Sequence, residues 1–240
     1  MKIVAMIPAR IGSERLKYKN LRLLAGKPVI SYSVNAAKEA KIFDNIVINS
    51  DEQIFKEIAD KNNVGFYLRP KYLGSSTTQS DEVVFDFLKH HVCDLLVWVN
   101  PIAPLQTGAE INKAINFLIK NKFDTVITSK KERFHTFFED KPLNFNLNEK
   151  FAKTQDLRPT SSLVYSLMMW KSKTFLKQYT SQGYGMLSGN LGLFEVDRKS
   201  TIKLNYEEDL QLCEAILNIS NDQSKKYDKI LEKYLNKNEK

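Results

Sequence analysis

Short apolar runs alternate with amphipathic, helix-like stretches through the first half of the chain. The predicted strands are 2–9, 44–51, 64–70, 94–101 and 124–131, and the predicted helices between them are 28–40, 52–63, 80–91 and 110–122. Strands joined through a helix run parallel, because such a crossover returns the chain to the same end of the sheet. The pattern therefore predicts an α/β fold with a doubly wound, mostly parallel sheet.

Polar residues lie at the carboxyl ends of four of these predicted strands. They are Arg10, the run Asn49-Ser50-Asp51, Arg69 and Asn100. In a doubly wound sheet the ligand binds outside the carboxyl ends of the strands. The sequence therefore predicts a binding site at that edge of the sheet.

The loop after the first strand is rich in cations. The stretch IPARIGSERLKYKNLR carries Arg10, Arg15, Lys17, Lys19 and Arg22. It matches neither the P-loop pattern nor the G-x-G-x-x-G dinucleotide fingerprint. Guanidinium and ammonium groups beside free backbone N–H donors suit a triphosphate, while a solvated basic turn is the alternative. The chain has a net charge of +8 but no recognisable nucleic-acid-binding module, which favours a phosphate-bearing small molecule over a nucleic acid.

The alternation is lost after Lys131. Segment 134–184 is aromatic and polar without a clear period, and we expect a flap or dimerisation sub-lobe there, within a single domain of residues 1–240. A strand over 190–196, a helix over 206–219 and a solvated terminal helix over 225–240 are predicted to follow.

Several partner classes are disfavoured by the sequence. No apolar stretch reaches the roughly 20 residues that a membrane span requires, and the N-terminal segment is too short and too soon charged for a secretory signal. Cys93 and Cys213 lie far apart in apolar surroundings without metal-ligand spacing, which indicates reduced core thiols. We therefore expect a cytoplasmic protein that binds neither membrane nor nucleic acid.

The opening stretch IPARIGSERLKYKNLRLLAGKPVISYSV resembles that of the cytidylyltransferases that activate acidic sugars as CMP-sugars. This group includes the acylneuraminate and the 3-deoxy-manno-octulosonate cytidylyltransferases, and its opening runs approximately I-P-A-R-x-G-S-K-x-x-x-x-K-N and then G-K-P-[LM]-I. The matching positions are Arg10, Gly12, Ser13, Lys19, Asn20, Gly26, Lys27 and Pro28. Glu14 departs from the sialic type, and Ser-Glu-Arg-Leu leans toward the Ser-Thr-Arg-Leu of the octulosonate type.

The resemblance extends over most of the chain. LRPKYLGSSTTQSDEVV is similar to the family's Arg-Pro plus Ser-x-[DE]-Val-Val pattern, which places Arg69 and Ser80 on expected nucleotide contacts. WVNPIAPLQT is similar to Leu-Gln-Pro-Thr-Ser-Pro-Leu-Arg-Thr, with Asn100 in place of glutamine, and TQDL places Gln155 in the Arg-Gln-Asp-Leu segment. The family likeness implies a nucleotide-diphospho-sugar transferase-like, Rossmann-like fold and a homodimer with an exchanged flap.

The reaction that this resemblance implies is transfer of CMP from CTP to an acidic keto-sugar, a nonulosonic acid or a related one, with release of pyrophosphate. Arg10 and Lys19 would be the catalytic residues and would clamp the triphosphate. The nucleotide would be bound by Arg10, Gly12, Ser13, Lys19, Asn20, Arg69 and Ser80, and the sugar by Asn100 and Gln155. Two alternatives remain: a nucleotidyltransferase for another base or sugar, and a catalytically weakened homologue that serves binding or assembly.

The C-terminal segment departs from the family. Members typically read Ile-Asp-Ile-Asp-Thr-x-x-Asp there, with two aspartates holding magnesium, whereas IKLNYEED places Lys203 and Asn205 at those positions. A lysine cannot ligate a hard cation, so we expect Mg²⁺ to arrive with CTP, and its protein ligands are unknown. Either Lys203 neutralises phosphate charge, or Glu207, Glu208 or Asp209 supplies ligands; the favoured interpretation of these acids is the first turn of a helix.

Overall fold

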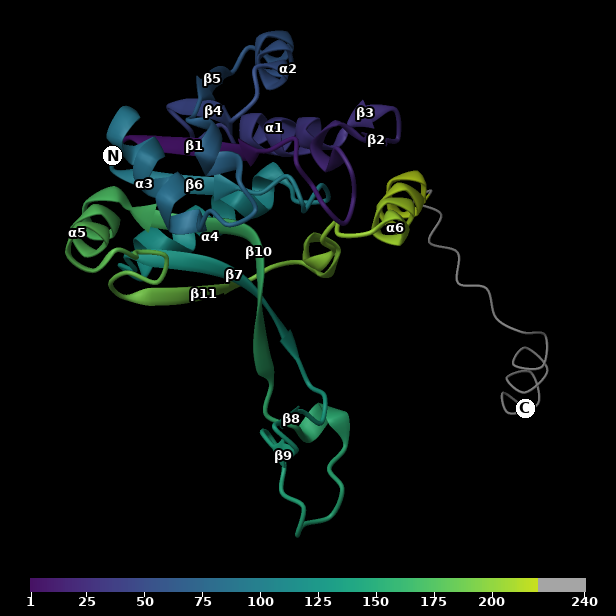
Figure 1. The fold of residues 1–240 in the computed structure, drawn as a ribbon. Helices are drawn as coiled ribbons and strands as arrows, with labels where there is room; N and C mark the ends of the chain where they lie inside the picture. The colour runs from purple at the N-terminus through teal and green to yellow at the C-terminus, as the bar shows by residue number, and fades with distance from the viewer. Residues whose placement is uncertain (220–240) are drawn as a thin grey trace, which may run out of the picture.

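Seven strands form the central sheet, in the order β11-β7-β10-β6-β1-β4-β5. The structure is a computed structural model and describes residues 1–219 (Figure 1). The strands are β1 (Ile3–Ala9), β4 (Asn45–Ser50), β5 (Gly65–Leu68), β6 (Leu95–Val99), β7 (Thr125–Glu132), β10 (Thr160–Lys171) and β11 (Leu191–Glu195). All neighbouring pairs are parallel except those that β10 makes with β6 and β7, so the predicted doubly wound, mostly parallel sheet is confirmed.

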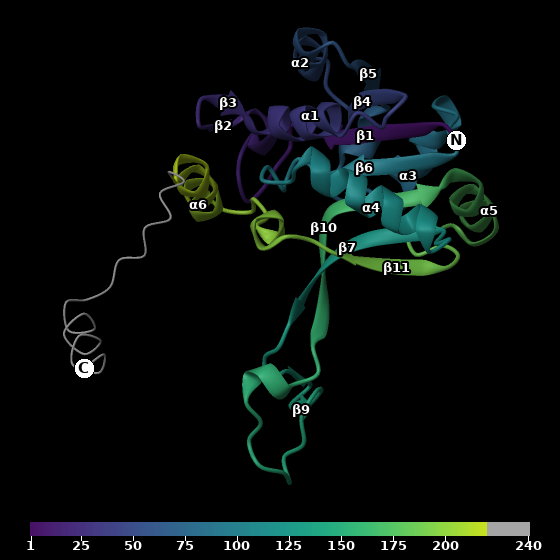
Figure 2. The same cartoon turned by 180° about the vertical axis from the view of Figure 1, so that it is seen from behind.

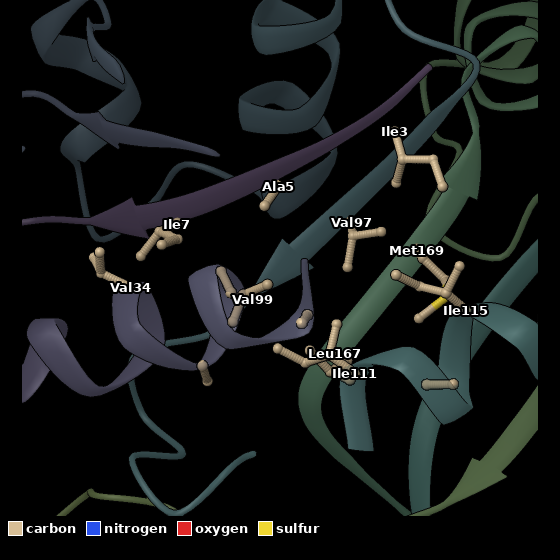
Figure 3. Packing of buried hydrophobic residues seen from close by; sticks show 14 of the residues in the cluster. Ile3, Ala5, Ile7, Val34, Val97, Val99, Ile111, Ile115, Leu167 and Met169 are labelled. Atoms are coloured by element: carbon tan, nitrogen blue, oxygen red, sulfur yellow. The ribbon is translucent and has the colours of Figure 1, made fainter. Parts of the chain in front are cut away.

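Helices cover both faces of the sheet (Figures 1 and 2). One face packs against α1 (Val29–Ala40), α2 (Ile54–Asn62) and α4 (Gly108–Lys120), and the other against α3 (Ser80–His90) and α5 (Ser172–Gln182). Alternate side chains of a strand point to opposite faces, so Ile3, Ala5 and Ile7 of β1 enter the first core (Figure 3), while Val4 and Met6 enter the second.

Further elements lie at the carboxyl edge of the sheet and beyond it. They are η1 (Lys19–Leu21), β2 (Leu23–Leu24), β3 (Lys27–Pro28), η2 (Lys71–Gly74), η4 (Arg198–Thr201) and α6 (Glu207–Asn218). A third, smaller apolar cluster joins Leu24 and Val29 to Leu204, Leu210 and Cys213, which fixes α6 beside β2 and β3. The terminal helix predicted over 225–240 lies outside the described residues. Among residues 1–219, no helix combines the length and apolarity needed to cross a membrane.

The segment that projects from the body is shorter than the predicted 134–184. Residues 133–159, here called the projecting ribbon, contain β8 (Phe137–Phe138), β9 (Lys141–Pro142) and η3 (Thr154–Asp156) and extend away from the sheet (Figure 1). Residues 160–171 return as β10, which pairs with both β6 and β7, and α5 then packs on α3. The C-terminal part of the predicted flap therefore belongs to the main body.

Strand β10 escaped prediction because its side-chain alternation is broken. Its register shifts between Leu163 and Met168, and Tyr165 inside this irregularity has a φ of 61°. A left-handed conformation is unusual for a bulky residue, and an irregular step moves the following side chains out of phase with the preceding ones. The sequence pattern consequently shows no continuous period of two across the strand.

Candidate active site

A cavity of about 500 Å³ opens at the carboxyl edge of the sheet. Its lining includes most of the predicted site residues: Arg10, Ser13, Lys19, Asn20, Arg69, Ser80 and Asn100. Residues 10, 69 and 100 directly follow β1, β5 and β6, so the strand ends do bring these side chains together. Gly12 lies in the loop between two lining residues but is not itself on the lining.

The basic loop, residues 10–22, folds back on itself beside the cavity. The side-chain amide of Asn20 donates to the carbonyl of Arg10 at 3.2 Å, and the N–H of Ser13 donates to the carbonyl of Ile11 at 3.0 Å. Tyr18 adopts a left-handed conformation with a φ of 54°, which turns the chain into η1. Three of the five cationic side chains of the loop, those of Arg10, Arg15 and Lys19, line the cavity.

Lys19 is the most buried cation of this loop. Its ammonium donates to the carbonyl of Leu204, which joins the basic loop to the segment before α6. Burial lowers the pKa of Lys19, and the nearby charges of Arg15 and Arg10 lower it further. Like charges that lie close together in a partly buried environment destabilise one another. They would therefore attract a polyanion strongly.

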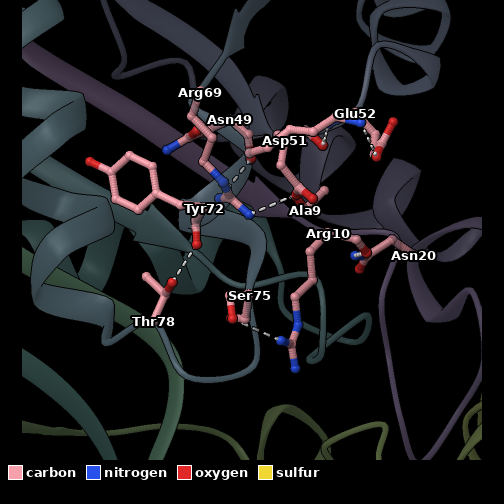
Figure 4. A network of polar contacts seen from close by, with 12 residues as sticks. Ala9, Arg10, Asn20, Asn49, Asp51, Glu52, Arg69, Tyr72, Ser75 and Thr78 are labelled. Carbon is pink, nitrogen blue, oxygen red and sulfur yellow. Dashed lines mark hydrogen bonds and ion pairs between the residues drawn. The ribbon is translucent and has the colours of Figure 1, made fainter.

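Arg69 is held almost entirely inside the protein, with 4% of its surface exposed. Its guanidinium donates to the carbonyls of Ala9 (3.2 Å) and Asn49 (3.3 Å) and to the carboxylate of Asp51 (3.1 Å), as Figure 4 shows. Burial lowers the pKa of Arg69 and the Asp51 charge opposes this effect. Arg69 thus ties the ends of β1 and β4 together, while its side chain also lines the cavity.

Gly74 makes room for this ion pair. A β-carbon at position 74 would lie 2.1 Å from an Asp51 carboxylate oxygen, far inside van der Waals contact. The loop that follows supplies hydroxyl groups from Ser75, Ser76 and Thr78 to the cavity lining. Arg10 reaches toward this loop, with Nη1 3.4 Å from the carbonyl of Ser75 (Figure 4).

The N-terminus of α3 also meets the cavity. Ser80, which lines it, is the first residue of the helix. The side chain of Glu82 accepts the N–H of Gln79 at 3.0 Å and closes a capping box that fixes the helix start. The partial positive charge of a helix N-terminus adds to the attraction that this cavity exerts on an anion.

Asn100 links the cavity to the irregular part of β10. Its side-chain amide donates to the carbonyl of Tyr165 at 3.1 Å, and its backbone N–H donates to the carbonyl of Ser166 at 3.0 Å. The ammonium of Lys203 lies 5.6 Å from the centre of the Tyr165 ring, a cation–π distance. Lys203 therefore lies beside Tyr165, next to the Asn100 side of the cavity.

The residues present do not fit a magnesium site held by the protein. Asn205 lines the cavity, but the carboxylate of Asp209 accepts the N–H groups of Asn205 and Tyr206 at 2.7 and 2.9 Å and caps α6. Glu207 pairs with Arg22 at 2.9 Å. Residues 1–219 contain no group of three or more His, Cys, Asp or Glu side chains placed to hold a metal ion. The carboxylates of Glu207 and Asp209 thus serve the start of α6, as the helix-turn interpretation predicts.

Gln155 lies apart from Asn100, the other residue predicted to contact the sugar. It lines a second hollow of about 580 Å³ at the base of the projecting ribbon, beside Arg133 and Arg198. Arg133 donates to the carbonyl of Gln155 at 3.4 Å, which keeps the residue beyond the end of β7. Because β10 lies between β6 and β7, Asn100 and Gln155 are separated within one chain.

The apolar wall of the cavity was missed by sequence reasoning. It is formed by Leu73, Val83 and Trp98, of which Trp98 lies on β6 and Val83 on α3. In the sequence each of these residues has the character of a core residue, and only the three-dimensional arrangement shows that they border an open cavity.

The cavity at the carboxyl edge of the sheet suits both halves of a nucleotide. Its basic groups and the helix N-terminus suit the phosphates, and its apolar wall suits the base. The protein is thus a nucleotide-binding α/β protein by class. The sequence profile of the cytidylyltransferase family matches residues 4–166, which is more than half of the chain. The chain belongs to this family, and the predicted resemblance is confirmed; it is a nucleotidyltransferase.

Several curated relatives and solved structures are similar to the chain. The chain is 27% identical to post-translational flagellin modification protein B of Campylobacter coli, over 94% of this chain and 99% of that protein. It is 26% identical to the N-acylneuraminate cytidylyltransferase of Streptococcus agalactiae serotype III (strain NEM316), over 83% of this chain and 51% of the relative, so it matches about half the length of that protein. The fold is similar to CMP:2-keto-3-deoxy-manno-octonic acid synthetase complexed with CTP, with a TM-score of 0.70 and 13% identity over 90% of this chain and 98% of the other.

Proposed function

We propose that this protein activates an acidic keto-sugar with CTP to give a CMP-sugar and pyrophosphate. The observation that carries the proposal is a single cavity that unites the cations Arg10 and Lys19, the apolar wall and the strand-end amide of Asn100. The names of relatives support the sugar class, because they describe enzymes for N-acylneuraminate and for 2-keto-3-deoxy-manno-octonic acid. The sugar is thus a nonulosonic acid or a related keto-acid.

In the proposed reaction the sugar hydroxyl attacks the α-phosphorus of CTP. An oxygen–phosphorus bond forms to the sugar, the bond to pyrophosphate breaks, and the hydroxyl proton is released. Such a transfer depends mainly on positioning and on stabilising phosphate charge. Arg10 and Lys19 would hold the triphosphate, with Ser13 and the loop N–H groups beside them. Asn20, Arg69 and Ser80 would bind the nucleotide, and Asn100 would contact the sugar.

Magnesium enters this proposal only as a counter-ion of CTP. Mg²⁺ keeps several waters and binds readily through substrate phosphates with few protein ligands. Lys203 and Asn205 occupy the positions at which the family resemblance implies carboxylates, so the proposal assigns the ion no ligand from the described residues.

A catalytically weakened binding protein is the second candidate. The observation that favours it is the cation–π contact of Lys203 with Tyr165 in the segment where the family's metal-binding aspartates are expected. Such a protein would bind CTP in the same cavity without releasing pyrophosphate.

We also propose that the protein is a cytoplasmic homodimer. The projecting ribbon exposes large apolar side chains, among them Phe134, Phe137, Phe138, Leu143, Leu147 and Phe151. Several large exposed apolar side chains on one short segment are typical of a protein–protein contact. The partner that we propose for this exposed surface of the ribbon is a second copy of the chain. The buried free thiols of Cys93 and Cys213 support a reducing compartment.

The proposal is tested by incubating the protein and Mg²⁺ with each of the four ribonucleoside triphosphates and a panel of nonulosonic and octulosonic acids, while following pyrophosphate release. We expect release with CTP and at least one keto-acid, and loss of that release in the Arg10→Ala variant. Tight CTP binding without release from any sugar would favour the weakened homologue. A preference for another nucleotide would overturn the cytidylyltransferase specificity.

A further inference from the structure

Tyr165 has a left-handed backbone in the middle of a strand. Its φ is 61°, inside the irregular step of β10 between Leu163 and Met168. The other non-glycine residues with positive φ among residues 1–219 lie in turns or at helix ends, where the chain changes direction. A bulky residue in this conformation is strained, and such strain persists only where neighbouring contacts enforce it, commonly at functional sites. The strain at Tyr165 therefore calls for an explanation.

Asn100 enforces this conformation from the edge of the cavity. Its side-chain amide donates to the carbonyl of Tyr165 at 3.1 Å, and its backbone N–H donates to the carbonyl of Ser166 at 3.0 Å. Asn100 itself lines the cavity. Tyr165 is 41% exposed, so burial of its ring in a core does not account for the strain. An irregular step of this kind redirects a side chain, and here the redirected ring meets Lys203.

The segment before α6 directs Lys203 to the cavity side. Ile202 and Leu204 both pack in the third apolar cluster, and the backbone at Ile202 is extended. Alternate side chains of an extended chain point to opposite sides, so Lys203 and Asn205 point away from that cluster. Asn205 lines the cavity, and the N–H of Leu204 donates at 2.8 Å to the carbonyl of Ile102, another lining residue.

The contact with Tyr165 fixes the ammonium of Lys203 without neutralising it. The ammonium lies 5.6 Å from the centre of the ring, and among residues 1–219 no carboxylate pairs with it. An aromatic face attracts a cation through its quadrupole, but it brings no opposite charge. An ammonium has three N–H donors, so one held in this way can still bind an anion.

We propose that Tyr165 is a positioning residue, whose ring holds the ammonium of Lys203 at the Asn100 side of the cavity so that it binds an anionic oxygen of the reactants. This inference rests on the proposed function, which brings two kinds of anionic oxygen to the cavity, those of the CTP phosphates and those of the sugar carboxylate. Lys203 is then a binding residue, and the C-terminal segment adds a fixed positive charge to those of the basic loop.

The first comparison is Lys203→Met against the matched control Lys89→Met. Lys89 lies 5.5 Å from the centre of the Phe85 ring, and neither of these two residues lines the cavity. The dissociation constant of CTP, from calorimetry, reports on the phosphates, and the KM of the keto-acid that supports pyrophosphate release reports on the carboxylate. Lys203→Met should raise one of these two constants about tenfold, as expected for a lost charge-assisted hydrogen bond. Lys89→Met should change neither by more than about twofold.

The second comparison separates the ring of Tyr165 from its backbone. Asparagine adopts the left-handed conformation readily, so Tyr165→Asn removes the ring and keeps the backbone, whereas Tyr165→Phe keeps a ring for the cation. Tyr165→Asn should raise the same constant about threefold, and Tyr165→Phe should stay close to wild type. In a Lys203→Met background, Tyr165→Asn should have no further effect, because the ring then has no cation to hold.

Three results would overturn the inference while the proposed function stands. They are an active wild type in which Lys203→Met behaves like Lys89→Met, equal constants for Tyr165→Asn and Tyr165→Phe, and an effect of Tyr165→Asn that is the same with and without Lys203. If wild type releases no pyrophosphate from CTP with any acid of the panel, the proposed function itself fails and the inference fails with it.

Discussion

The ammonium of Lys19 donates to the carbonyl of Leu204, which lies 185 positions further along the chain. This contact brings the basic loop to the segment that carries Lys203 and Asn205. The C-terminal segment thus forms part of the cavity, although the central sheet ends at β11. Substitutions in either segment should therefore affect the same site.

Replacing Arg10 by alanine should weaken CTP binding by about 2–3 kcal/mol, because a charge-assisted contact to a phosphate is lost. Within the described residues the Arg10 guanidinium makes only one hydrogen bond, a long one to the carbonyl of Ser75, so it is available to a ligand. Lys17→Ala is the matched control, since Lys17 is an exposed cation of the same loop that does not line the cavity. Titration calorimetry with CTP compares the two variants, and equal losses would contradict the assignment of Arg10.

Gly74→Ala should destabilise the fold by about 3 kcal/mol. The added methyl group would collide with the carboxylate of Asp51 and disturb its buried ion pair with Arg69. Gly12→Ala should change the free energy of unfolding by less than about 0.5 kcal/mol, because a β-carbon there meets nothing within 4 Å. Urea unfolding of both variants measures the difference. A Gly74→Ala protein as stable as wild type would show that the Asp51 carboxylate can move aside without loss of stability.

How much of this architecture could be predicted depends on whether a pattern is local. The alternating strands and helices of the first half are predictable because each buries an apolar face with its own period. The antiparallel strand β10 is not, because the left-handed Tyr165 interrupts its period and its place between β6 and β7 is decided by tertiary pairing.

The residues of the candidate site can likewise be divided into those that the sequence predicts and those that it does not. Arg10, Arg69 and Asn100 are predictable because polar residues at the carboxyl ends of parallel strands converge. Gln155 is not, since the sequence does not tell on which side of β10 the residue lies. Trp98 resembles a core residue in the sequence, and its place on the cavity lining is visible only when the fold is known.

The stability of the protein should fall with acid through His91. Burial lowers the pKa of His91 from its ordinary value of 6.5, and its ring stacks on Phe87 and meets the edge of Tyr67. The unfolded chain therefore binds the proton more readily, so stability is complete above pH 6.5 and is lost as the pH falls from 6.5 through the lower pKa of the folded state. His91→Phe should flatten the unfolding free energy between about pH 7 and 5. An unchanged slope in that variant would assign the acid sensitivity to other groups.

Serine at both Phe137 and Phe138 should convert the proposed dimer into a monomer. These side chains are exposed on β8 of the projecting ribbon, and burying them against a second copy would remove apolar surface from water. The control carries serine at Ile54 and Leu68, which are comparably exposed on α2 and β5 of the main body. Sedimentation at micromolar concentration should give a dimer for wild type and control. A monomeric wild type would refute the dimer directly.

The magnesium requirement should depend on position 205 more than on position 203. Asn205 lines the cavity, so Asn205→Asp would add a carboxylate next to the phosphates and should raise Mg²⁺ affinity in the absence of nucleotide. Wild type should bind Mg²⁺ weakly without CTP and readily with it.

Lys203 lies over the Tyr165 ring, next to the Asn100 side of the cavity, where its charge can offset that of the phosphates. Lys203→Asp should therefore lower turnover. Magnesium titrations with and without CTP, together with turnover of both single variants and the double variant, measure these effects separately. Faster turnover in the double variant would show that the loss of two carboxylates has weakened an ancestral metal site, and tight Mg²⁺ binding by nucleotide-free wild type would place the metal at other residues.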